Sequence, residues 1–224
     1  MDFLDSILRF SLEELPFIVI SLIVAFTIHE FAHAYTAYKF GDDTAAKQGR
    51  LTLNPAQHLD PFGTILILIA GFGWARPVPV NRFNLSRPRL HSILVSLAGP
   101  LSNFLIAFLS YGIYLILDNF GGVSQSMMFF RSLFEIMGYL NVLLFVFNLL
   151  PFPPLDGYRI IEDIVPARIR PILTKYEQYG ILLFLIFIIT PLDQYLIWPF
   201  INGGIYIVFS GFYSIYHFIL LPFL

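Results

Sequence analysis

The chain has 224 residues, of which 57% are hydrophobic and only 12% are charged. Soluble domains contain about 45–50% apolar and about 25% charged residues, so this composition excludes an ordinary soluble protein. The 13 Lys and Arg against 15 Asp and Glu leave no basic surplus, which argues against a nucleic-acid partner. Because cysteine is absent, any metal must be bound by histidine and carboxylate side chains.

Hydrophobic runs recur from residue 15 to the end with short polar breaks, so we predict one membrane-embedded domain over residues 1–224. Residues 1–15 hold four acidic groups and one arginine, a balance that disfavours a signal peptide and favours a short interfacial helix. We predict an all-α polytopic membrane protein with about five transmembrane helices. Each expected span has about the twenty residues needed to cross the bilayer core: 16–38, 90–117, 132–150, 179–198 and 201–223.

The hydrophobic run 61–74 has only fourteen residues, a length typical of a re-entrant segment. If it does not cross, eleven Lys and Arg lie on one face of the membrane, and Arg9 and Arg131 lie on the other. If the run crosses, the more favourable orientation places nine Lys and Arg on one face of the membrane and four on the other. Because cytoplasmic loops collect positive charge, we predict a re-entrant segment and an N-terminus outside the cell.

Short extended patterns flank this run at residues 49–54 and 75–81. Both predict brief strands. Pro77 and Pro79 lack the backbone N–H, so the second can only be an edge strand with one side free for another chain.

The first expected span contains the pattern H-E-x-x-H, formed by His29, Glu30 and His33. Two histidines four residues apart are offset by about 40° on a helix, so both can bind one zinc ion while the glutamate reaches its water. The alternatives are a buried hydrogen-bond cluster or a proton path. Three ionisable groups inside a membrane helix need a compensating partner, however, and zinc supplies one.

A catalytic zinc site needs a third protein ligand and an open water position. The candidate is Asp156, which follows three prolines at the end of the span 132–150. Its alternative role is to cap the next helix. His33 lies six residues before Lys39, so the histidines are near the end of the first span. If 61–74 re-enters, Asp156 emerges on that same face of the membrane.

The residues resemble the site-2 protease family of intramembrane zinc metalloproteases. The H-E-x-x-H pattern is followed by Asn148-x-x-Pro151 and Leu155-Asp156-Gly157. The segments from Leu53 to Thr64 and from Gly99 to Asn103 are similar to further signatures of its compact bacterial branch. The resemblance covers about residues 15–165, the expected catalytic core, whereas residues 179–223 match only in hydrophobicity.

The resemblance implies that His29, His33 and Asp156 hold one zinc ion and that Glu30 is the catalytic base. It also implies a bacterial cell membrane and matches Asn103 and Asn148 to family asparagines near the site, where they hold the substrate backbone or, alternatively, pack between helices. Many members of the family carry an added PDZ or nucleotide-sensing module, for which we expect no room in this chain. Membrane-spanning proteins would be the substrates, and an unwound segment could pair with the free edge at Val78 and Val80. The alternatives are a zinc or proton transporter and an inactive relative that only binds membrane proteins.

Overall fold

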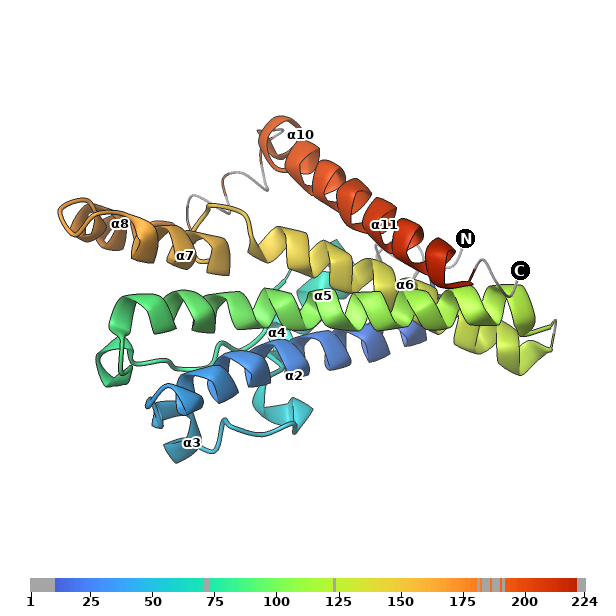
Figure 1. Ribbon diagram of the computed structural model, residues 1–224, viewed down its shortest axis with the longest axis horizontal. Helices are drawn as coiled ribbons and strands as arrows, with labels where there is room; N and C mark the ends of the chain where they lie inside the picture. The colour runs from blue at the N-terminus through green and yellow to red at the C-terminus, as the bar shows by residue number, and fades with distance from the viewer. Residues whose placement is uncertain are drawn as a thin grey trace.

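The protein is largely helical in its computed structural model (Figure 1). Three helices are long and apolar enough to cross a membrane, and they pack side by side. At 1.5 Å per residue each exceeds the bilayer core of about 30 Å. These helices are α2 (Leu15–Lys39), α5 (Pro88–Phe120) and α6 (Gln125–Asn148). The structure describes residues 11–70, 73–122, 124–180, 182, 186, 190 and 192–220.

Each of these helices begins at a recognisable start signal. A proline stands in the first turn of α2 and of α5, where its missing N–H leaves no hydrogen bond unmade. The Ser124 side chain caps α6 by accepting a hydrogen bond from the N–H of Met127. Residues 1–10, which cover most of the expected interfacial helix, lie outside the described residues.

The short hydrophobic run forms a closed hairpin. Its helix, α4 (Pro61–Ala70), has ten residues and reaches about 15 Å, half of the bilayer core. The two ends of the hairpin meet, because Leu59 and Ala75 form an antiparallel bridge and the Arg76 N–H donates to the His58 carbonyl at 2.8 Å. The residues on either side of the run, 58–59 and 75–76, therefore lie side by side.

The predicted strands at 49–54 and 75–81 are wrong. Among the described residues, the only β-pairing is the isolated bridge at Leu59 and Ala75. Residues 75–81 form neither a helix nor a regular strand, and we call them the strap. Side chains take the place of a partner strand, because Arg50, Glu30 and Asp42 bind its backbone groups. Two prolines in the strap remove the donors that a regular ladder needs.

The chain turns sharply after α6 and then forms α7 (Asp156–Ile164) and α8 (Arg170–Glu177). Gly157 permits the turn: a Cβ there would lie 2.4 Å from the Leu149 carbonyl oxygen. α7 packs against α5, the helix that also contacts α2. The start of α7 is thereby brought to the helix that carries the two histidines.

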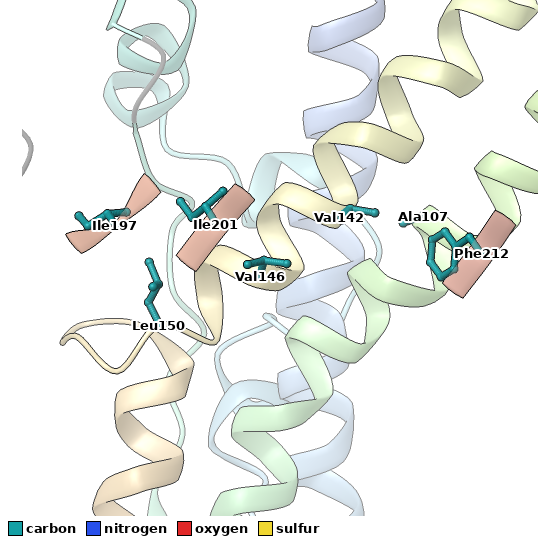
Figure 2. Packing of buried hydrophobic residues seen from close by; sticks show 7 residues of the cluster. All are labelled: Ala107, Val142, Val146, Leu150, Ile197, Ile201 and Phe212. Carbon is teal, nitrogen blue, oxygen red and sulfur yellow. The ribbon is translucent and has the colours of Figure 1, made fainter. Parts of the chain in front are cut away.

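The last described elements are the short α10 (Leu192–Leu196) and the 23-residue α11 (Trp198–Leu220). α11 crosses over α5 and α6, and the buried side chains of Figure 2 fill the contact. Phe212 packs edge-on against Phe104 and Phe108. The predicted span 201–223 is helical as far as it is described, whereas most of 179–198 lies outside the described residues. The core residues are Ala107, Val142, Val146, Leu150, Ile197, Ile201 and Phe212.

A buried ionic cluster joins the end of the strap to α7 and α8. Arg82, at the start of η2 (Arg82–Asn84), contacts Glu162 at 2.8 Å and Asp163 at 3.5 Å. Arg170 contacts Asp163 at 2.7 Å, and the Thr174 hydroxyl donates to Glu162. Burial alone would raise the pKa of Glu162, but these donors and cations hold the pKa below its usual value of 4.5.

Replacing Glu162 with glutamine should lower stability at neutral pH by about 2 kcal/mol, because it removes the carboxylate that Arg82 contacts at 2.8 Å in a buried cluster. A carboxyl whose folded pKa is depressed stabilises the protein above its unfolded pKa, and this stability is lost as pH falls through the folded value. The difference in melting temperature between wild type and variant should therefore shrink below pH 4.5.

Glu177→Gln is the matched control, because Glu177 meets Arg159 at 3.9 Å on a half-exposed surface. Equal melting temperatures for Glu162→Gln and wild type at pH 7 would contradict the assigned role of the cluster.

Candidate metal centre

Three side chains that can bind a metal converge inside the bundle. His29 and His33 lie one turn apart on α2, and Asp156 is the first residue of α7. The two Nε2 atoms are 3.0 Å apart, and Asp156 Oδ2 lies 3.2 Å from each of them. All three residues are at most 9% exposed. The spacing on α2 and the turn after α6 thus bring together the three predicted ligands.

Hydrogen bonds at the far side of each ring set the direction of the histidines. His29 Nδ1 lies 2.6 Å from Asn103 Oδ1, and His33 Nδ1 lies 2.7 Å from the Val95 carbonyl oxygen. A carbonyl oxygen only accepts, so each Nδ1 carries the hydrogen and donates it. In the neutral imidazole each Nε2 then carries a lone pair on the side of Asp156, which is the form that binds a metal.

Asn103 is itself held by a buried chain of amides. Its Nδ2 donates to Asn141 Oδ1 at 2.9 Å and to the Ala25 carbonyl at 3.4 Å, and Asn141 in turn donates to the Met137 carbonyl. These bonds fix which end of the Asn103 amide faces His29. Asn141 was not among the residues predicted from the sequence, although an asparagine within an apolar span is itself a signal of a buried polar partner.

The two asparagines predicted to hold substrate have different surroundings. Asn103 is fully buried and faces His29, so the structure gives it a contact with a predicted ligand. Asn148 is half-buried at the end of α6, and its Nδ2 donates to the Leu144 carbonyl of its own helix. Contact of Asn148 with substrate stays a prediction.

Gly99 allows α5 to pass directly over the histidines. A Cβ at this position would lie 2.3 Å from His33 Nε2 and 2.6 Å from His29 Nε2, closer than real Cβ contacts. Pro100 follows inside the helix, where it removes one backbone N–H. The Gly-Pro pair of the sequence motif therefore lies where α5 passes over the two histidines.

The donor set fits a zinc ion. Two neutral imidazoles and one carboxylate are a ligand set of catalytic zinc, which keeps a fourth position for water. Asp156 Oδ2 is buried and, within the described part of the chain, makes no hydrogen bond of good geometry. A buried carboxylate oxygen needs a proton donor or a cation, and a metal ion held by these three residues would supply the cation.

Glu30 lies beside the histidines on α2 and contacts the strap. It is 8% exposed, and its Oε2 accepts a hydrogen bond from the Val78 N–H at 2.7 Å. Its Oε1 accepts no hydrogen bond from any residue that the structure describes. One oxygen of Glu30 is thus held by the backbone, and the other has no hydrogen bond to a described residue.

Asp42 fixes the end of the strap beyond Val78. It is buried, and its Oδ2 accepts the Asn81 N–H at 2.6 Å, while its Oδ1 accepts from Asn84 and Thr44. Burial alone would raise the pKa of Asp42, but these hydrogen bonds lower it below the usual value of 3.8. Asp42 is therefore ionised at neutral pH and holds the strap independently of Glu30.

The chain is similar in sequence to a known protein family and to individual known proteins. The model of Peptidase family M50 matches residues 17–191. The "Putative zinc metalloprotease YwhC" of Bacillus subtilis is 55% identical over 204 residues, 90% of this chain and 93% of that protein. The "Putative zinc metalloprotease Rip2" of Mycolicibacterium smegmatis is 32% identical over 78% of this chain and 67% of its own length. No solved structure matches the chain significantly.

Proposed function

We propose that this chain, which belongs to Peptidase family M50, is an intramembrane zinc metalloprotease that hydrolyses peptide bonds of membrane-spanning proteins. The observation that carries the proposal is that Asp156, from α7, meets His29 and His33 beside Glu30 on α2, a helix able to span a membrane. A peptidase site at this position would act on substrates that enter from the bilayer.

His29, His33 and Asp156 hold the zinc ion, and Glu30 is the catalytic base. A zinc ion held by these residues would supply a water of lowered pKa and a Lewis acid for the carbonyl of the scissile bond. Glu30 takes the proton of the attacking water and returns it to the leaving nitrogen. The Val78 N–H holds one oxygen of Glu30 during this exchange, so the carboxylate does not have to be ordered anew at each step.

We propose that the hairpin around α4 enters the membrane and returns on the same face, within a chain of five spans. The bridge between Leu59 and Ala75 and the short length of α4 support this topology, as does the distribution of Lys and Arg. The N-terminus is then outside a bacterial cell membrane. Cysteines introduced at Gln48 and Phe83 should react with an impermeant reagent from one face only, and reaction from opposite faces would exclude the topology.

The strap is the segment proposed to bind substrate. A membrane-spanning helix hides its carbonyls in its own hydrogen bonds, so a few residues must unwind before they are attacked. The Val78 N–H is engaged by Glu30, whereas the Val80 N–H has no hydrogen bond to a described residue. Val80 is therefore the donor that an extended substrate segment would meet, with Asn148 as a further polar contact.

Replacing His33 with alanine should remove zinc and abolish cleavage together. Wild-type protein purified in detergent should contain one zinc per chain and should cleave a fluorogenic single-span peptide of leucine and alanine with a central Gly-Gly pair. His91→Ala is the control, since His91 stacks on Phe40, which follows the last residue of α2, and is not one of the proposed ligands. Stoichiometric zinc in His33→Ala would show that the ligands are misassigned. Zinc flux into vesicles without peptide cleavage would favour a transporter.

A further inference from the structure

Arg50 is a buried cation at the edge of the metal centre. It follows α3 (Thr44–Lys47), and its own N–H donates to the Ala45 carbonyl at 2.8 Å, which fixes its backbone. The residue is 6% exposed. Its Nη2 donates to the carbonyls of Arg76 and Pro77 in the strap, at 2.7 and 3.3 Å.

The charge of Arg50 has no direct carboxylate partner. Within the described residues, no carboxylate oxygen lies within 4.0 Å of its guanidinium, and its Nε is buried without a hydrogen bond. Burial and the neighbouring Arg76 lower the pKa of Arg50, and the negative charge of Glu30 raises it. A buried charge needs compensation, and Glu30 is the anion that provides it here.

One peptide unit connects the two charges. The Pro77 carbonyl and the Val78 N–H belong to the same planar peptide and point in opposite directions. Arg50 binds the carbonyl side, and Glu30 Oε2 accepts from the N–H side at 2.7 Å. The dipole of this peptide is thus aligned between a cation and an anion. Rotation of the peptide would break both contacts together.

We propose that Arg50 is a positioning residue for Glu30, acting through the Pro77–Val78 peptide. By holding the Pro77 carbonyl, Arg50 directs the Val78 N–H at Glu30 Oε2 and leaves Oε1 free to take the proton of the attacking water. The inference rests on the proposed role of Glu30 as the base. It does not require Arg50 to touch zinc or substrate.

The two prolines of the strap make a direct measurement possible. Within residues 77–80 only Val78 and Val80 carry a backbone N–H. Hydrogen exchange measured in this segment therefore reports on these two amides alone. In Arg50→Gln the Val78 amide should exchange at least about tenfold faster, since the orienting contact is lost. The Asn81 amide, which Asp42 holds separately, should keep its wild-type rate.

Kinetics on the leucine–alanine peptide supply the second readout. In Arg50→Gln, kcat should fall by about ten- to a hundredfold with KM within about twofold, because positioning is lost and binding is kept. Zinc content should stay at one per chain. Arg50→Lys retains the charge and should recover part of the loss. Lys47→Gln removes an exposed cation nearby and should match wild type.

Unchanged kcat or unchanged Val78 exchange in Arg50→Gln would overturn the proposal. Equal acceleration at Val78 and Asn81, or loss of zinc, would also overturn it, because Arg50 would then hold the strap or the fold as a whole. Failure of the wild type to cleave the peptide would instead count against the proposed function. The exchange experiment would still decide whether Arg50 orients the Val78 N–H.

Discussion

Replacing Gly99 with alanine should abolish zinc binding and peptide cleavage. The added methyl group would lie 2.3 and 2.6 Å from the two histidine Nε2 atoms, which carry the lone pairs that face Asp156. Neither imidazole can move away freely, because the opposite side of each ring is hydrogen-bonded, His29 to Asn103 and His33 to the Val95 carbonyl. The methyl group must therefore displace the ligand atoms or push α5 away from α2. Loss of even one supporting contact typically costs ten- to a hundredfold in metal affinity, and this change disturbs two ligands.

Metal analysis after purification, together with a competition titration against a chelator, would measure the loss. Gly138→Ala on α6 is the control, since its added methyl group would lie 3.6 Å from its nearest neighbour, which is ordinary contact. That variant should retain one zinc per chain and wild-type cleavage. One tightly bound zinc per chain in Gly99→Ala would mean that the metal lies elsewhere.

The placement of His29, Glu30 and His33 was predictable because it depends on one helix. A spacing of four residues sets two side chains on one face, whatever surrounds the helix. Predicting Asp156 as the third ligand required more information, because Asp156 reaches the histidines only if α6 ends on their side of the membrane. The three prolines and Gly157 indicated a turn there, and the charge distribution indicated the side.

The surroundings of these residues were not predictable in the same way. The hydrogen bond between Asn103 on α5 and Asn141 on α6 depends on how the two helices are rotated relative to each other. The sequence periodicity of a single helix does not determine that rotation. The strap was expected to pair as an edge strand, yet its backbone is bound by the side chains of Arg50, Glu30 and Asp42. Those contacts join residues 26 to 48 positions apart, and an extended pattern carries no information about such partners.

Replacing Glu30 with glutamine should lower kcat by about a hundred- to ten-thousandfold, which is the usual contribution of a general base. Zinc content should not change, because the three ligands remain. The glutamine side chain has the same length, so its oxygen can still accept the Val78 N–H, and the Val78 amide should keep most of its protection. Combined measurement of kcat, zinc and exchange would separate loss of the proton carrier from collapse of the site.

The Glu30→Asp variant tests the length of the side chain rather than the charge of the carboxylate. The aspartate keeps an ionised carboxylate but is shorter by one methylene, about 1.5 Å, and a displacement of this size can cost on the order of a hundredfold in rate. It also draws the carboxylate away from the Val78 N–H, which now lies 2.7 Å from Glu30 Oε2, so exchange at Val78 should accelerate in this variant and not in Glu30→Gln. Cleavage by Glu30→Asp at near the wild-type rate would mean that another group carries the proton, even if zinc is bound as proposed.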